Sequence, residues 1–268
     1  MKRIYLALII SVLLQGSFVS SSCPSIAGNP RLYYFNPDSA QSNLVRLKLA
    51  MEAFFDQSGY PVNFQAFSYQ TDFDAKINEQ QPKFLFAPEW YIKKYGWKLR
   101  IKPFLVPVYK GSTTYHKVLL VTQSSPVTLN SSERYSLAMT SVGPDSRTFL
   151  NRVLFQNHLK KNLPFRTVIV PKSTDALFAL FLGQVDSAIV VEEHLDNLKK
   201  MLPRITSGVR PLVQSKPIRM PMLCYSEKLV SKKEVENFKT VFLSKGSNIN
   251  RNKLMDLLQI DGWQEASK

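Results

Sequence analysis

The sequence is poor in the residues that define several large classes of protein. It has only two cysteines in 268 residues, too few to staple a chain of this length by disulfides. Charged residues make up only 21%, whereas aromatic residues reach 12%, which excludes an intrinsically disordered chain. No uninterrupted apolar run approaches the roughly 18 residues that a membrane-spanning helix needs. What remains is a folded chain with enough apolar material for one large domain or two lobes.

Motifs that carry catalysis are also missing. The chain has no Gly-x-Ser-x-Gly turn, no His-Glu-x-x-His pair, no Cys-x-x-Cys and no glycine-rich phosphate loop. Its three histidines, His116, His158 and His194, are far apart in the sequence. His194 with Glu193 and Asp196 is a weak metal pattern. We therefore expect neither an enzyme nor a bound metal or cofactor.

The chain is strongly basic, with 35 Lys+Arg against 20 Asp+Glu and a formal net charge of +15. This excess is spread along the whole sequence, whereas nucleic-acid binders usually concentrate it on one element with interleaved aromatic residues. We therefore expect no nucleic-acid partner. Two interpretations of the basic excess remain open: a solvated basic surface, and long-range attraction of anions.

The first 27 residues have the pattern of a secretory signal peptide. Two basic residues precede an apolar stretch over 4–14, and Ser25 and Ala27 supply the small side chains for cleavage after Ala27. This predicts export to the periplasm. Lipid attachment at Cys23 is an alternative, although a Ser stands where lipoprotein signals usually carry Leu, three residues before the Cys.

Two series of alternating strands and helices follow. In the first series, apolar residues recur at helical spacing from 44 to 55, between predicted strands over 31–35 and 62–67. Such strand–helix–strand units build parallel sheets, so we expect an α/β fold. Further strands are predicted over 84–87, 135–140, 167–170, 188–191 and 222–225, and closing helices at about 232–243 and 250–258.

Between the two series the pattern predicts an antiparallel hairpin of 99–109 with 115–122. We expect two lobes joined by this hairpin going out and by a strand near 209–225 returning. The predicted boundaries give a discontinuous lobe I, 28–122 and 216–268, and a lobe II, 123–215.

Several segments together resemble a known family. They are Phe84-Leu85-Phe86-Ala87-Pro88-Glu89-Trp90-Tyr91, Asp145-Ser146-Arg147-Thr148, the run from Asp175 to Val190, and the ending 258–263. They resemble a type 2 periplasmic solute-binding protein of the phosphate, phosphite and phosphonate-binding subfamily. The resemblance implies two lobes, each a mixed sheet flanked by helices, joined by two hinge-crossing strands.

The resemblance also implies a function. A small anionic ligand binds between the lobes of a monomer, which delivers it to the membrane permease of an ABC importer. The alternative is a sensing module of the same fold that signals to a membrane sensor kinase or cyclase. A periplasmic enzyme is a further alternative that the sequence favours least.

Candidate ligand-binding residues come partly from the resemblance. Ser146, Arg147 and Thr148 stand at the helix start that cradles the anion in phosphonate-binding relatives, where free N–H groups and the helix dipole stabilise negative charge. Arg147 replaces a small hydroxyl residue there. Tyr91 matches the family's Tyr after a Gly-Pro turn, and Thr174 stands at the position of the family's His. Glu192 corresponds to the acidic residue that meets an amino group in aminoalkylphosphonate binders.

Three further candidates come from position alone. Asn36 and Asp38 follow the first predicted strand at its carboxyl end, the edge where α/β sheets bind ligands. Trp90 opens a predicted helix beside another strand end, where an aromatic ring could line a cleft. Turn chemistry for Asn36 and Asp38, and core packing for Trp90, are the competing interpretations.

Overall fold

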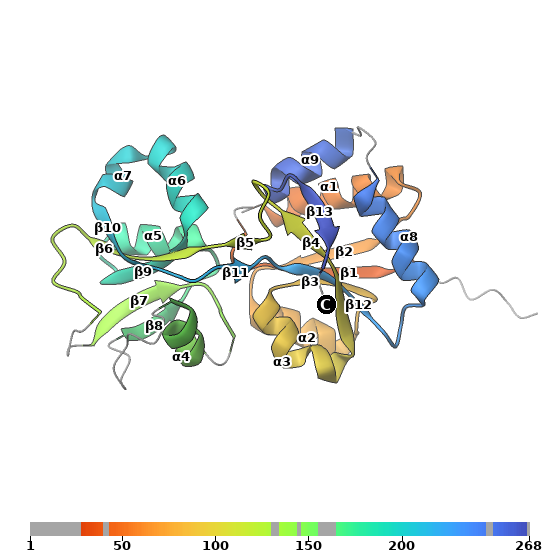
Figure 1. The fold of residues 1–268 in the computed structure, drawn as a ribbon, viewed down its shortest axis with the longest axis horizontal. Helices are drawn as coiled ribbons and strands as arrows, with labels where there is room; N and C mark the ends of the chain where they lie inside the picture. Colours follow the sequence, from red (N-terminus) through yellow and green to blue (C-terminus); the bar gives the residue numbers. More distant parts are fainter. Residues whose placement is uncertain are drawn as a thin grey trace, which may run out of the picture.

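The computed structural model describes residues 28–39, 43–129, 134–143, 146–154, 165–244 and 249–266. They form two lobes, each around its own β-sheet, and the chain crosses twice between them (Figure 1). The predicted signal peptide, with Ala27 and Cys23, lies outside the described residues. Among the described helices, none has both the length and the apolar character needed to cross a membrane.

The first lobe contains a six-stranded sheet to which distant parts of the chain contribute, in the order β13-β4-β12-β3-β1-β2. β1 pairs in parallel with β2 and β3, whereas β12 lies antiparallel between β3 and β4. The elements of this lobe are β1 (Arg31–Phe35), α1 (Leu44–Gln57), β2 (Asn63–Phe67), α2 (Gln70–Glu79), β3 (Phe84–Ala87), α3 (Glu89–Leu99), β4 (Ile101–Val108), β12 (Met222–Ser226), α8 (Lys232–Leu243), α9 (Ile249–Leu258) and β13 (Gly262–Glu265).

Capping residues fix where two of these helices begin. The Asn43 side chain accepts a hydrogen bond from Arg46 N at 2.9 Å and caps α1. Ser231 caps α8 in the same way, accepting from Glu234 N at 3.2 Å. Both helices repeat apolar residues at three- or four-residue spacing, so one face of each packs onto the sheet.

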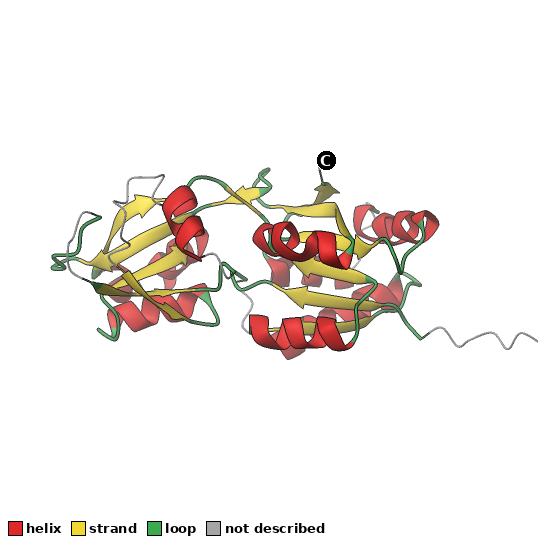
Figure 2. Cartoon of the chain, turned by 90° about the horizontal axis from the view of Figure 1, so that it is seen from below, coloured by secondary structure: helices red, strands yellow, loops and turns green. Residues whose placement is uncertain are grey.

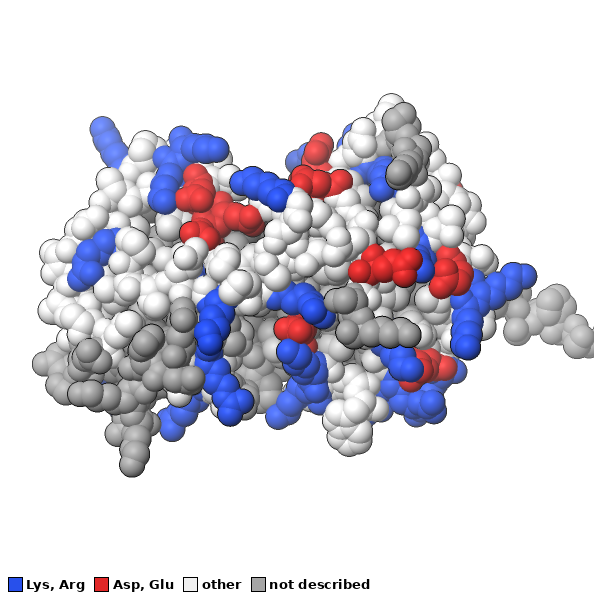
Figure 3. All heavy atoms as spheres, viewed as in Figure 1, with Lys and Arg blue, Asp and Glu red and all other residues white. Residues whose placement is uncertain are grey.

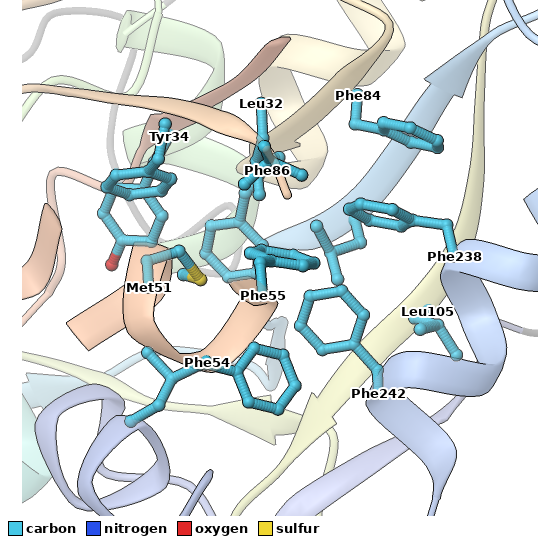
Figure 4. Packing of buried hydrophobic residues seen from close by; sticks show 14 of the residues in the cluster. Leu32, Tyr34, Met51, Phe54, Phe55, Phe84, Phe86, Leu105, Phe238 and Phe242 are labelled. Atoms are coloured by element: carbon cyan, nitrogen blue, oxygen red, sulfur yellow. The ribbon is translucent and has the colours of Figure 1, made fainter. Parts of the chain in front are cut away.

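Aromatic side chains fill the space between α1, α8 and the sheet (Figure 4). Phe84 of β3 stacks on Phe238 of α8, with ring centroids 3.7 Å apart and planes 7° apart. Phe55 of α1 contacts both Phe238 and Phe242. A second apolar cluster covers the other face of the sheet. Dense packing on both faces holds β1 and β3 in fixed positions.

The second lobe contains a five-stranded sheet in the order β10-β6-β9-β7-β8, with apolar clusters on both faces. Figure 2 shows the helices of each lobe lying on either side of its strands. The elements of this lobe are β6 (Lys117–Thr122), β7 (Tyr135–Met139), α4 (Ser146–Phe149), the π-helix η1 (Leu150–Leu154), β8 (Phe165–Ile169), α5 (Ser173–Phe181), β9 (Ser187–Val191), α6 (Glu192–Met201), α7 (Pro203–Ser207) and β10 (Val209–Gln214).

The two crossing segments pair with each other between the lobes. β5 (Thr114–Tyr115) and β11 (Ile218–Arg219) form a two-stranded antiparallel sheet. Beside it, Lys117 N donates to Ser215 Oγ at 2.9 Å, and Ser215 N donates to Lys117 O at 2.8 Å. The predicted pair of hinge-crossing strands is therefore present.

The observed strand pairing differs from the predicted hairpin at the first crossing between the lobes. The hairpin of 99–109 with 115–122 is wrong, because β4 pairs with β12 and β13 whereas β6 pairs with β9 and β10. The segment between β4 and β6 carries the chain across the junction instead of turning it back. β6 belongs to the second sheet, so the crossing precedes the predicted boundary at 122/123. β10 ends at Gln214, next to the boundary predicted at 215/216.

Candidate functional site

Loops at the carboxyl ends of three strands meet where the lobes face each other. Asp38 follows β1 and Trp90 lies just after β3, both in the first lobe. The segment 140–143 follows β7 in the second lobe. This edge of an open α/β sheet is where ligands usually bind.

A cavity of about 400 Å³ opens between these loops. This volume falls within the roughly 300–1,000 Å³ that is usual for small-molecule sites. The first lobe, the second lobe and the crossing segments all contribute to its wall. The charged and hydroxyl-bearing residues of the wall are Asp38, Glu89, Lys93, Lys94, Tyr115, Lys117, Thr148 and Arg219.

A buried ion pair joins the lobes at the wall of this cavity. Lys117 Nζ lies 2.8 Å from Asp38 Oδ2, and the two side chains are only 2% and 9% exposed. Lys117 Nζ also donates to Thr140 Oγ1 at 3.0 Å. Thr140 Oγ1 donates to Asp38 Oδ1 at 2.6 Å, and Tyr115 OH donates to Asp38 Oδ2 at 2.6 Å. We call Asp38, Tyr115, Lys117 and Thr140 the clasp.

The clasp keeps Asp38 ionised in spite of its burial. Burial alone would raise the pKa of Asp38, but the charge of Lys117 and the hydrogen bonds from Lys117, Thr140 and Tyr115 bring the pKa below its ordinary value. Burial and the neighbouring Asp38 charge raise the pKa of Tyr115 well above its ordinary value, so its hydroxyl stays a donor. A carboxylate of the first lobe is therefore held by donors of the second lobe and the hinge.

Two further contacts cross the junction, from the loop 140–143 to α2 and α3 of the first lobe. Ser141 Oγ donates to Gln70 Oε1 at 2.8 Å. Gly143, with φ of 89°, lies so close to the Trp90 ring that an added Cβ would stand 2.7 Å from a ring carbon. Together with the clasp, these contacts hold the loop 140–143 of the second lobe against the first lobe.

Positive charge predominates around the cavity. Lys93 pairs with Glu89 at 3.1 Å, and Lys117 pairs with Asp38. The cavity wall also contains Lys94 and Arg219, and neither forms an ion pair with a described residue. Figure 3 shows basic side chains on both sides of the junction between the lobes. The wall therefore carries a net positive charge that favours anions.

Four of the nine predicted site residues lie at the interlobe cavities. Asp38, Trp90 and Thr148 line the cavity of about 400 Å³. Asn36 lines a smaller neighbouring cavity of about 70 Å³, which shares Asp38 and Tyr115 with the first. The Asn36 side chain also accepts a hydrogen bond from Asp38 N at 3.1 Å, so turn chemistry and site geometry coincide here.

The other five predicted residues line neither of these two cavities. Tyr91 is buried in the first lobe, where its hydroxyl donates to Asp74 Oδ1 at 2.8 Å. Ser146 and the exposed Arg147 begin α4, one turn before the cavity-lining Phe149. Thr174 lies in the first turn of α5, and Glu192 accepts hydrogen bonds from Gln214 Nε2. Their roles in ligand binding stay predictions.

Sequence reasoning missed Lys117, the central cation of the clasp. Lys117 begins the apolar strand β6, where a basic residue usually indicates a solvent-exposed strand end. One signal was available: Lys117 is the only charged residue of the strand Lys117–Thr122, which is otherwise suited to burial. Its partner Asp38 is distant in the sequence, so only the fold brings the two together.

The sequence of the chain matches a known protein family. Residues 33–268 match the family described as "ABC transporter, phosphonate, periplasmic substrate-binding protein". No curated protein sequence matches the chain significantly.

Solved structures share the fold at low sequence identity. The binding protein component of an ABC phosphonate transporter from Pseudomonas aeruginosa has a TM-score of 0.71 and 16% identity, covering 89% of this chain and 82% of that one. PhnD1 from Prochlorococcus marinus, in complex with methylphosphonate, has a TM-score of 0.69 and 11% identity, covering 88% of this chain and 92% of that one. A histidine kinase sensor domain has a TM-score of 0.53 and 13% identity, covering 88% and 98%.

The structural likenesses establish a type 2 periplasmic-binding-protein fold. The family match extends over nearly all the described residues and includes both lobes and the cavity between them. The chain therefore belongs to the family of periplasmic substrate-binding proteins of phosphonate ABC transporters.

Proposed function

We propose that the cavity between the lobes binds a small anion, of the class of phosphonates, related oxyanions or carboxylates. The observation that carries this proposal is the excess of positive charge in the cavity wall. Asp38 and Glu89 are matched by Lys117 and Lys93, whereas Lys94 and Arg219 have no carboxylate partner among the described residues. A bound anion would supply the negatively charged partner that Lys94 and Arg219 lack.

The family supplies the wider setting. Its members are extracytoplasmic binding proteins that deliver a small ligand to an ABC permease. For this chain we propose that a signal peptide is cleaved after Ala27, that the exported protein works as a monomer, and that its partner is a permease and not a sensor. N-terminal sequencing of the exported protein tests the cleavage position, and light scattering tests the oligomeric state.

A thermal-shift screen tests the anion proposal. The panel contains phosphate, phosphite, methylphosphonate, alkylsulfonates and carboxylates, with uncharged alcohols of similar size as controls. A ligand that binds only the folded protein stabilises it by RT ln(1 + [L]/Kd), which is about 2.7 kcal/mol at a hundred times Kd. We expect at least one anion, and no alcohol, to raise the melting temperature. A panel without any shift would refute the proposal.

Charge variants then locate the site. Arg219→Gln and Lys94→Gln each remove an unpaired cation from the cavity wall. Each should weaken the anion found in the screen by about tenfold or more, the usual effect of losing a charged hydrogen bond. Lys98→Gln is the matched control, because Lys98 lies on α3 but is exposed and outside the cavity wall. Equal affinities in all three variants would place the anion elsewhere.

A further inference from the structure

Much of the cavity wall is apolar, although charges stand around it. The apolar residues are Pro88, Trp90, Val142, Phe149, Pro217 and Ile218. The first lobe, the second lobe and the crossing segment contribute two each, so the apolar wall depends on the lobes being together. Apart from the indole N–H of Trp90, these six side chains offer an inorganic oxyanion no hydrogen bonds in exchange for its hydration.

The cavity is also larger than an inorganic oxyanion requires. Its volume of about 400 Å³ equals that of about a dozen water molecules at about 30 Å³ each. Phosphate or methylphosphonate would displace only a few of them and leave the rest against apolar side chains. A ligand with an apolar body would displace that water as well, which is favourable because apolar surface leaves water.

Aromatic rings and cations are neighbours in the wall. Lys117 Nζ lies 5.9 Å from the centroid of the Phe149 ring. On the opposite lobe, Trp90 and the two cations Lys93 and Lys94 lie within the same two turns of α3. Lys117 is already paired with Asp38, so a ligand whose apolar body rests between these two rings has the lysines of α3 in the same wall for its anionic group.

We propose that the natural ligand is an organic anion whose apolar body is larger than a methyl group, such as an aryl-substituted phosphonate, sulfonate or carboxylate, in preference to methylphosphonate or an inorganic oxyanion. This inference rests on the proposed anion site and adds to it the chemistry of the rest of the ligand. Cavity size and apolar lining carry it, whereas the unpaired cations carry the anion proposal.

Calorimetric titration of the wild-type protein with three probes separates the two proposals. Burial of the phenyl ring predicts that phenylphosphonate binds about 10- to 100-fold more tightly than methylphosphonate. Inorganic phosphate should bind no better than methylphosphonate. If methylphosphonate or phosphate binds as tightly as phenylphosphonate, the apolar-body inference fails and the anion site stands. If none of the three binds, the same comparison is made with benzenesulfonate against methanesulfonate and with benzoate against acetate, and both proposals fail if none of these anions binds either. Both also fail if uncharged benzyl alcohol binds as well as phenylphosphonate.

A matched pair of variants tests which surface holds the apolar body. Phe149→Ala removes part of the apolar wall without changing any charge, and should reduce the preference for phenylphosphonate over methylphosphonate about tenfold. Trp97→Ala is the control, since Trp97 lies on α3, is 80% exposed and does not line the cavity. Circular dichroism tests whether both variants are folded. An unchanged preference in folded Phe149→Ala would overturn the inference; if this variant does not fold, the wild-type titration decides.

Discussion

Removal of Lys117 from the clasp should open the lobes. At the observed 2.8 Å and an effective dielectric constant of about 20, Coulomb's law gives an attraction of roughly 6 kcal/mol between Lys117 and Asp38. Desolvation of two buried ions costs several kcal/mol each and offsets most of this attraction. Lys117→Met removes the attraction but leaves the Asp38 carboxylate desolvated. A charge left alone in a closed interior usually costs about 3–5 kcal/mol.

Because the clasp joins two lobes, the protein can escape this cost by opening and returning Asp38 to water. We therefore expect Lys117→Met to lower the free energy of unfolding by less than about 3–5 kcal/mol and to raise the radius of gyration measured by X-ray scattering. The double variant Lys117→Met with Asp38→Asn carries no buried charge and should recover part of the lost stability.

Lys83→Met is the matched control. Lys83 pairs with Glu234 at 2.7 Å, but both residues belong to the first lobe and are partly exposed. Its loss should cost at most about 1 kcal/mol and leave the radius of gyration unchanged. The reasoning on the clasp is refuted if Lys117→Met matches this control in both measurements, or if the double-mutant cycle shows no coupling between Lys117 and Asp38.

The clasp also has a predictable response to pH. Because the pKa of Asp38 lies below its ordinary value of 3.8, the ionised carboxylate contributes stability at every pH above that value. This contribution is lost as the pH falls through the lowered pKa. We expect the wild-type radius of gyration to stay constant from pH 7 to pH 4 and to increase only at more acidic pH. A radius of gyration that increases already at pH 5 would contradict a lowered pKa of Asp38.

Three other predictions concern stability and reactivity. Gly143→Ala forces a Cβ against Trp90 at positive φ, and should lower the urea-denaturation free energy by about 1–3 kcal/mol; no change would mean that the loop relaxes freely. Phe238→Ala removes the ring that stacks on Phe84 and should lower the free energy of unfolding by about 3–5 kcal/mol in the same assay. A smaller decrease than that caused by Lys117→Met would contradict the view that this aromatic packing stabilises the first lobe. Cys224 is fully buried, and burial raises the pKa of its thiol well above the ordinary value; it should react with thiol reagents only after unfolding, and rapid labelling of the native protein would contradict this.

The sequence predicted elements whose periodicity is strong. The strand over 31–35 and the helix that begins at 44 are confirmed, because their apolar residues lie on the faces that the fold buries. β13 was not predicted: Gly262–Glu265 is a short edge strand whose residues are half-buried or exposed. α2 was also missed, because only two of its residues, Phe73 and Ile77, are buried.

Pairing between distant segments was harder to predict. The predicted strands 99–109 and 115–122 contain the observed strands β4 and β6, but the pairing partners of these strands are decided by contacts far along the chain. The clasp could not be predicted for the same reason, because its residues are far apart in the sequence and meet only in the fold. Asp38 was predicted from its place after β1, whereas Lys117 becomes a site residue only when the fold buries it against that carboxylate.

The central claim, that an anion binds between the lobes, can be tested on the tryptophan side chains. The chain has three tryptophans: Trp90 in the cavity wall, the exposed Trp97, and the half-buried Trp263, which packs against the first-lobe core. Their three indole N–H signals are recorded in a ¹H–¹⁵N correlation spectrum and assigned with the two variants Trp97→Phe and Trp263→Phe. Titration with phenylphosphonate or methylphosphonate should shift the Trp90 signal progressively and leave the Trp97 signal in place. Calorimetrically detected binding that leaves the Trp90 signal unmoved would contradict the account.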